Sequence, residues 1–268
     1  MFRIGWFSTG RDEAARELLK TVQRSIARGQ IKAEIAFTFS NREPGEARES
    51  DLFFELVKEH RIPLICFSSS KFRARRPDKA SWRQEYDREV MKSIEGEMGF
   101  HPDLCVLAGY MLIVGEEMCR EYPMLNLHPA VPDGPAGTWQ EVVWRLIESR
   151  AQEAGAMMHV VTPELDKGPP ATYCTFSLRG EPFDRHWEEM GGRPIESVKN
   201  EQGEKAPLFR LIRQYELARE FPLIVATLKA FAEGRIRIEP GKVVDAGGRP
   251  IAGYDLSAEI DEMLKREP

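Results

Sequence analysis

The chain has 268 residues, of which 42% are hydrophobic and 30% are charged, and its formal net charge is -5. These values are typical of a soluble globular protein, and the charge gives no general attraction to nucleic acid or to an anionic membrane. No apolar run approaches the roughly 18 residues that span a bilayer. The four cysteines, Cys66, Cys105, Cys119 and Cys174, include no CxxC pair. We therefore expect reduced thiols and a cytoplasmic location.

The first half of the chain alternates short apolar runs with stretches rich in helix-forming residues. Strands are predicted over 2–7, 33–39, 62–67, 103–108 and 124–127, and helices over 11–28, 47–60 and 81–98. A capping box at Ser81 is expected to open the last helix. This alternation is typical of a mostly parallel sheet with helices on both faces.

The second half departs from this alternation. A helical stripe begins at Trp139, and strands are predicted over 154–161 and 171–178. The polar stretch 180–206, rich in Gly and Pro, is predicted to be a long loop. One or two helices are predicted over 208–232 with a break near Pro222, and a terminal β-hairpin follows over 235–244. No linker divides the chain into separate domains.

Two polar motifs follow apolar runs that indicate buried strands. Asn126-Leu127-His128-Pro129 ends the short strand at 124–127, and Leu165-Asp166-Lys167-Gly168-Pro169 follows the strand at 154–161. Open α/β sheets carry their chemistry at such strand ends. An amide, an imidazole and a carboxylate together can stabilise an oxyanion, orient a base and move a proton.

Each of these residues also has a simpler interpretation. His128 could bond a loop carbonyl, Asn126 could cap a turn, and Asp166 could bond the backbone of its own turn. His159, inside the preceding strand, is either a core histidine or a side chain that lines the cleft.

Asn-x-His-Pro followed by His-x-x-Thr-x-x-Leu-Asp-x-Gly-Pro resembles the folate-dependent formyltransferases. The resemblance extends to 83–89, 106–111, 221–224 and 231–235. It implies a three-layer α/β formyltransferase fold, with a mostly parallel Rossmann-like sheet flanked by helices and a C-terminal β-hairpin. It also implies a single domain, 1–268. Residues 1–125 would form the Rossmann-like half that binds the acceptor, and 126–268 would form the catalytic and folate-binding half, with the helix and hairpin tail.

The resemblance implies transfer of a formyl group from 10-formyltetrahydrofolate to an amine, with glycinamide ribonucleotide, in purine synthesis, as the expected acceptor. The implied catalytic residues are Asn126, His128 and Asp166. Folate-side residues would be Met111, Leu112, Val114, His159, Leu165 and Gly168. Acceptor-side residues would be Ser8, Thr9, Gly10, Arg11, Arg83 and Gly109. No metal is needed, and small molecules are the expected partners of a monomer or homodimer, with no nucleic acid or membrane.

The first loop departs from the family pattern. Ser8-Thr9-Gly10-Arg11-Asp12-Glu13 replaces a Ser-Gly-Asn-Gly-Ser-Asn type loop that cradles a phosphate at a helix N-terminus. Asp12 and Glu13 would oppose a phosphate there unless their side chains point away. On the folate side, Leu112 replaces an arginine of the family.

Four alternatives therefore stay open. They are a formyltetrahydrofolate hydrolase, a transferase for another amine such as an amino-sugar nucleotide, a transferase for initiator tRNA, and a folate-binding protein without turnover. The hydrolase is expected to carry an N-terminal regulatory domain and the tRNA enzyme a C-terminal barrel.

Overall fold

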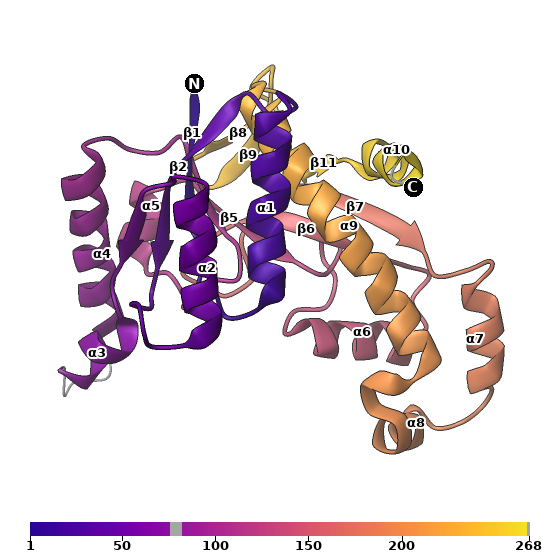
Figure 1. Cartoon of the computed structure of the whole chain (residues 1–268). Helices are drawn as coiled ribbons and strands as arrows, with labels where there is room; N and C mark the ends of the chain where they lie inside the picture. Colours follow the sequence, from indigo (N-terminus) through magenta and orange to yellow (C-terminus); the bar gives the residue numbers. More distant parts are fainter. Residues whose placement is uncertain (76–81, 267–268) are drawn as a thin grey trace.

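An eight-stranded sheet forms the centre of the molecule, which a computed structural model describes over residues 1–75 and 82–266. The strand order is β11-β7-β6-β5-β4-β1-β2-β3 (Figure 1). These strands are β1 (Phe2–Phe7), β2 (Ala33–Ser40), β3 (Leu64–Cys66), β4 (Leu104–Leu107), β5 (Met124–His128), β6 (Glu153–Val160), β7 (Pro170–Ser177) and β11 (Tyr254–Asp255). The five strands from β3 to β5 are mutually parallel, whereas β6 is antiparallel to both β5 and β7.

Helices cover both faces of this sheet (Figure 1). One face carries α1 (Glu13–Ala27), α2 (Arg48–Glu59), α9 (Pro207–Ala232) and α10 (Ser257–Arg266), and the other carries α3 (Ser69–Ala74), α4 (Trp82–Met98) and α5 (Glu116–Glu121). At the far end, α6 (Trp139–Glu148), α7 (Phe183–Met190), α8 (Ile195–Gln202) and a short 3-10 turn (Gly203–Lys205) surround the first half of α9. A second, antiparallel sheet consists of β8 (Ile236–Glu239), β9 (Lys242–Asp245) and β10 (Pro250–Ile251). The predicted three-layer α/β fold with a C-terminal hairpin is confirmed.

The strand order reverses beside β1, and this reversal positions the site. The chain runs from β1 to β2 and β3 on one side, then returns to place β4 on the other side of β1. Ligands of open α/β sheets bind in the crevice at such a switch point, beyond the carboxyl ends of the strands. Here the loops after β1 and β4 touch, because the Thr9 N–H donates to the Gly109 carbonyl at 3.1 Å.

The segment 180–206 was wrongly predicted to be a loop, because α7, α8 and the 3-10 turn occupy most of it. Phe183, Trp187 and Met190 form an apolar stripe on α7, and Ile195 and Val198 pack from α8. The indole N–H of Trp187 also donates to the Leu178 carbonyl at 2.8 Å. Each of these helices has only 8 residues, so its stripe is too short to stand out in a stretch rich in Gly and Pro.

The expected break at Pro222 is likewise wrong, because α9 continues through it as one helix of 26 residues. Proline removes a single intrahelical hydrogen bond, and the helix is held by its burial against β6, β7 and α1. Thr227, one turn beyond, links α9 to the sheet through a 2.6 Å hydrogen bond to Thr172. Elsewhere the predicted strands and long helices are present, while α3, α5, α10 and β11 were not predicted. The expected cap Ser81 lies outside the described residues.

The four cysteines are free thiols, and Cys105 and Cys174 are buried. Within residues 1–75 and 82–266, no helix combines the length and the apolar character that crossing a bilayer requires.

Glu216 on α9 gives the fold a testable pH dependence. Its side chain is fully buried, and burial raises the pKa of its carboxyl to about 8, while the Arg213 guanidinium, 3.7 Å away, opposes this rise. Between about pH 4.5 and 8 the folded state therefore binds a proton that the unfolded state has released, so the free energy of unfolding falls as the pH rises. Glu216→Gln cannot ionise, and we expect it to unfold at higher urea concentration than the wild type at about pH 8.

The control for this measurement is Glu196→Gln on α8, where the glutamate is exposed. Urea unfolding of the three proteins at about pH 5 and pH 8 gives the comparison. A wild-type pH slope that survives unchanged in Glu216→Gln would contradict the role given to Glu216.

Candidate active site

Two neighbouring antiparallel strands bring the polar side chains of the candidate active site together. In the β5–β6 ladder, Asn126 lies opposite His159, and His128 lies opposite Met157. The imidazole rings of His128 and His159 are 6.1 Å apart and nearly perpendicular. Both histidines are almost fully buried, at 4% and 2% exposed, so the cluster has little contact with bulk water.

His159 sets the orientation of the Asn126 amide. Its Nδ1 lies 3.0 Å from the Val160 carbonyl, which can only accept, so Nδ1 carries the proton. Its Nε2 therefore accepts from the Asn126 amide nitrogen at 3.2 Å. Burial lowers the pKa of His159, and the nearby His128 adds to this, which keeps the ring neutral and able to accept. The second N–H of Asn126 is left to donate to a reacting oxygen.

Asp166 lies between the two imidazoles. Its Oδ1 is 3.6 Å from His159 Nε2, and its Oδ2 is 3.9 Å from His128 Nδ1. The residue has φ +54°, in the left-handed region that Asp and Asn tolerate better than most side chains. The loop that carries it returns to the sheet through a hydrogen bond from the Val160 N–H to the Pro169 carbonyl at 2.9 Å.

His128 makes the loop contact that its simpler interpretation predicted, and it faces the carboxylate as well. Its Nε2 lies 3.1 Å from the Pro135 carbonyl, so this nitrogen carries a proton and donates to the loop that follows β5. Its Nδ1 faces Asp166. When both nitrogens are protonated, the ring is an imidazolium beside a carboxylate, which is a pair suited to stabilising negative charge and relaying a proton.

The hydroxyl groups of the loop after β1 form hydrogen bonds to other groups of the protein. Thr9 Oγ1 donates to Asn41 Oδ1 at 2.7 Å and accepts the Met111 N–H at 3.0 Å. Ser8 Oγ accepts the Gly10 N–H at 3.1 Å, and both hydroxyl residues are buried. Of the predicted acceptor-side residues, Ser8, Thr9 and Gly10 therefore build the loop. Arg11 and Arg83 are exposed, and the Arg83 guanidinium lies 5.8 Å from the centre of the Trp82 ring.

The N-terminus of α1 is already capped by a carboxylate. Asp12 Oδ1 accepts the Ala15 N–H at 3.0 Å, and Asp12 Oδ2 lies 3.2 Å from Arg11 Nε. The Asp12 side chain thus points toward the helix N-terminus, where an anion would otherwise bind.

The predicted folate-side residues divide into exposed and buried groups. Met111 is 48% and Leu165 63% exposed, which is unusual for large apolar side chains. Val114 is buried in the apolar cluster that also contains Val161. Gly168 packs on β6, because a Cβ there would lie 1.6 Å from the Val160 carbonyl oxygen. Leu112 is half-buried and packs against the same cluster, so Met111 and Leu165 are the most exposed of the predicted folate-side residues.

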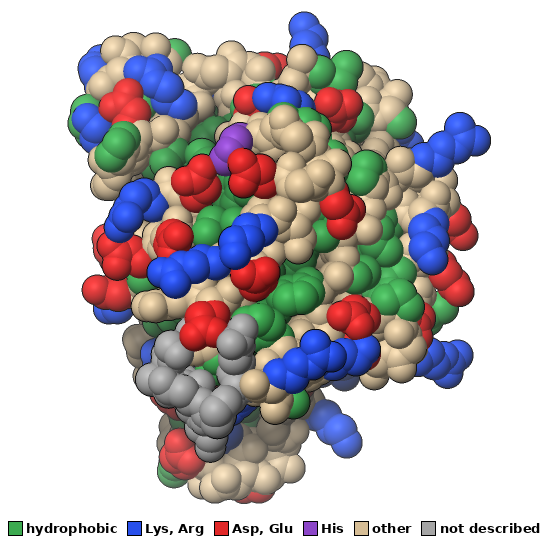
Figure 2. Space-filling view, turned by 90° about the vertical axis from the view of Figure 1, so that its left-hand side faces the viewer, with side chains coloured by type: hydrophobic (Ala, Val, Ile, Leu, Met, Phe, Trp, Pro, Cys, Tyr) green, Lys and Arg blue, Asp and Glu red, His purple; other side chains and the backbone are tan. Residues whose placement is uncertain are grey.

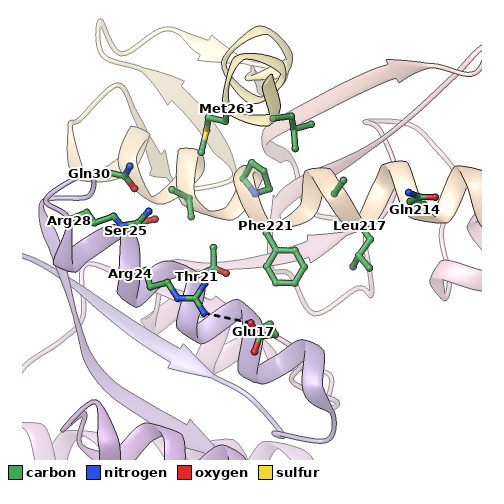
Figure 3. A pocket seen from close by; sticks show the side chains of 14 residues that line it. Glu17, Thr21, Arg24, Ser25, Arg28, Gln30, Gln214, Leu217, Phe221 and Met263 are labelled. Carbon is green, nitrogen blue, oxygen red and sulfur yellow. Dashed lines mark ion pairs between the residues drawn. The ribbon is translucent and has the colours of Figure 1, made fainter. Parts of the chain in front are cut away.

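A hollow in the described surface lies away from the cluster. It has a volume of about 930 Å³ and lies between α1, α9 and α10, with Arg24, Leu217, Phe221 and Met263 among its lining residues (Figure 3). Asn126, His128 and Asp166 do not line it. Within residues 1–75 and 82–266, no group of three or more His, Cys, Asp or Glu is arranged to hold a metal ion.

Sequence reasoning missed two contributors to this region. The Pro135 carbonyl binds His128, and no residue-type signal identifies a backbone acceptor. Asp87 on α4 is 4% exposed, and its carboxylate holds the N–H of Gly115 at 2.7 Å. The buried stripe Trp82, Tyr86, Val90 of α4 could have drawn attention to it, because position 87 borders that stripe.

The fold and the cluster are those of an α/β protein that transfers a chemical group. An amide donor, an imidazole and a carboxylate lie together beside the switch point of the sheet. Comparison with known families makes the assignment specific. The chain belongs to the formyl transferase family, whose model matches residues 6–175, more than half of the chain.

Curated relatives carry two different names. The phosphoribosylglycinamide formyltransferase of Saccharomyces cerevisiae is 35% identical over 99 residues, which is 34% of this chain and 45% of the yeast protein. The phosphoribosylglycinamide formyltransferase of Escherichia coli is 35% identical over 154 residues, which is 56% of this chain and 63% of the E. coli protein. The formyltetrahydrofolate deformylase of Bacillus subtilis is 30% identical over 143 residues, 53% of this chain and 40% of its own length. Each match spans less than two thirds of the relative.

Solved structures share the fold. A phosphoribosylglycinamide formyltransferase from Coxiella burnetii has a TM-score of 0.67 at 21% identity and covers 95% of this chain and 98% of its own. Glycinamide ribonucleotide transformylase 1 from Symbiobacterium toebii has a TM-score of 0.60 at 22% identity. The match covers 91% of this chain and 94% of the Symbiobacterium chain.

Proposed function

We propose that this protein transfers a formyl group from 10-formyltetrahydrofolate to an amine. One observation carries the proposal: a neutral His159 turns the Asn126 amide so that an N–H is free beside the His128–Asp166 pair. Attack of an amine on a formyl carbon produces a tetrahedral oxyanion, which needs such a donor, and releases a proton, which needs such a pair.

The surroundings of the cluster fit a reduced folate. Met111 and Leu165 offer exposed apolar surface for a flat ring system. Within the described part of the chain, the N–H groups of Leu112 and Ile113 make no protein hydrogen bond, so they are free to recognise the polar edge of a pterin. Both groups lie just after β4, the strand beside β5.

Glycinamide ribonucleotide is the first acceptor to test, because the yeast and E. coli relatives are named for it. The Asp12 carboxylate at the start of α1 favours a second candidate, an acceptor without a phosphate at this place. Water is one such acceptor, and the Bacillus relative carries the name of a deformylase.

The assay follows tetrahydrofolate release from 10-formyltetrahydrofolate with glycinamide ribonucleotide, with an unphosphorylated amine, and with no acceptor. Release that depends on an amine supports formyl transfer. Release at the same rate without any amine shows a hydrolase. Binding of the folate with no release under any condition would reject both enzymatic functions.

Asp12→Asn tests whether this carboxylate selects against phosphate. Asparagine caps a helix as well as aspartate does but carries no charge, so the start of α1 stays intact. We expect the KM for glycinamide ribonucleotide to fall by about two- to fivefold, since one charge at a helix N-terminus contributes roughly 0.3–1 kcal/mol. The KM for the unphosphorylated glycinamide riboside should stay unchanged. An equal fall for both acceptors would contradict the assigned role.

A further inference from the structure

Asp87 is a buried carboxylate outside the Asn126–His128–Asp166 cluster, and the chemistry proposed above makes no use of it. It lies on α4, and its Oδ2 accepts the N–H of Gly115 at 2.7 Å. A Cβ at position 115 would lie 2.9 Å from the same oxygen, so any larger residue there would displace the carboxylate from this position. A charged group held so closely against one backbone N–H points to a role in fixing that backbone.

Gly115 ends the segment 111–115, which links β4 to α5. The segment is attached to the protein at its two ends, by the Met111 N–H to Thr9 Oγ1 at 3.0 Å and by the Gly115 N–H to Asp87. Between these two bonds, the N–H groups of Leu112, Ile113 and Val114 donate to no protein group in residues 1–75 and 82–266. The conformation of the free N–H groups thus depends on these two hydrogen bonds, together with the packing of the Leu112 and Val114 side chains in the apolar cluster beside α4.

The charged groups around Asp87 come from α4 and α5. Arg83 lies one turn earlier on α4, and Glu117 on α5 is paired with Arg88 at 2.6 Å. Figure 2 shows the face built by these helices, on which acidic and basic side chains alternate. Burial raises the pKa of Asp87 to about 6, Glu117 adds to the rise, and the Gly115 N–H and Arg83 oppose it. The carboxylate is therefore charged above about pH 6 and becomes a weaker, neutral acceptor below it.

We propose that Asp87 is a positioning residue for co-substrate binding, which holds the segment 111–115 in the conformation that receives the folate ring through its hydrogen bond to Gly115. This inference rests on the proposed use of a reduced folate. Asp87 does not touch the reacting atoms, so its loss weakens folate binding and leaves the transfer step largely intact.

Direct binding of the stable analogue 10-formyl-5,8-dideazafolate tests this inference without requiring turnover. At about pH 7.5, Asp87→Ala is expected to raise the Kd of the analogue by about tenfold to a hundredfold, the value of a buried hydrogen bond to a charged group. Asp87→Asn retains an acceptor oxygen but not the charge, so its Kd should lie between those of Asp87→Ala and the wild type. Glu89→Gln is the matched control, since Glu89 is a half-buried residue of the same helix that pairs only with Lys92 among the ion pairs of the described residues.

Two further readouts separate positioning from general stability. Amide hydrogen exchange at Leu112, Ile113 and Val114 should accelerate in Asp87→Ala, while exchange in the β1–β4 ladder stays as in the wild type. In turnover measurements, the KM for 10-formyltetrahydrofolate should rise and kcat should stay within about threefold. The wild-type Kd should increase as the pH falls below about 6, whereas that of Asp87→Asn should not follow this change.

Normal binding by a folded Asp87→Ala, or a loss of kcat without a change in KM, overturns the inference alone. If Asp87→Ala does not fold, the pH comparison decides, because a wild-type pH dependence in Asp87→Asn also overturns it. Failure of the wild-type protein itself to bind the analogue overturns the proposed function and this inference with it.

Discussion

Replacing His128 with glutamine is expected to lower kcat by between about a hundredfold and ten-thousandfold, the range of positioned acid–base catalysis. Glutamine can still donate to the Pro135 carbonyl, the contact that the imidazole makes at 3.1 Å, so the loop after β5 keeps its anchor. What glutamine cannot do is accept and return a proton beside Asp166. The variant therefore removes the chemistry of the ring and preserves its structural bond.

The matched control is His101→Gln. His101 is an exposed histidine whose nearest carboxylate, Glu121, lies 3.5 Å away on the surface. Initial rates with saturating 10-formyltetrahydrofolate, together with circular dichroism and thermal unfolding, give the comparison. A His128→Gln protein that folds normally and turns over within about threefold of the wild type would remove His128 from the mechanism.

The second large effect is expected for Asp166→Asn. Asparagine tolerates the left-handed backbone of this position, φ +54°, so the loop between β6 and β7 should keep its conformation. The substitution removes the charge that lies 3.9 Å from His128 and 3.6 Å from His159. We expect kcat to fall by about a hundredfold to a thousandfold, because an imidazolium without its carboxylate partner is disfavoured in a buried site.

Asp133→Asn provides the matched control for this substitution. Asp133 also has a left-handed backbone, φ +62°, and lies in the neighbouring loop, with no ion pair to the cluster within the described residues. The rates of both variants should be measured across pH. Equal activity of Asp166→Asn and Asp133→Asn would show that the charge of Asp166 has no part in turnover.

The residues that the structure brings together in the candidate site were singled out in the sequence for a physical reason. Asn126 and His128 follow an apolar strand, and the Asp166 loop is bounded by prolines, so residue type and position both carry information there. Their convergence follows from the β5–β6 ladder, and strand pairing is a tertiary property. The resemblance to the folate-dependent formyltransferases is what indicated that these residues lie close together.

Other features depended on contacts that no local pattern encodes. Periodicity missed α7 and α8, because each has only 8 residues, and the contacts that hold them against α6 and α9 are formed in the folded protein. The Asn126–His159 hydrogen bond depends on which nitrogen of His159 faces Val160, and only the folded geometry settles that choice. Asp87 looked like any surface acid, since its burial arises when the segment 111–115 folds over α4.

The pairing of β5 with β6 fixes the positions of the cluster residues, and selection can change the neighbouring loops independently of this pairing. Asn126 and His159 are cross-strand neighbours inside a hydrogen-bonded ladder, where a shift of one residue would turn every side chain to the opposite face. The loops at 8–12 and 130–137 are connections outside that ladder. Their sequences can therefore diverge without shifting the register that places Asn126 opposite His159. Relatives that keep this ladder and differ in these loops are the evolutionary pattern that such an arrangement permits.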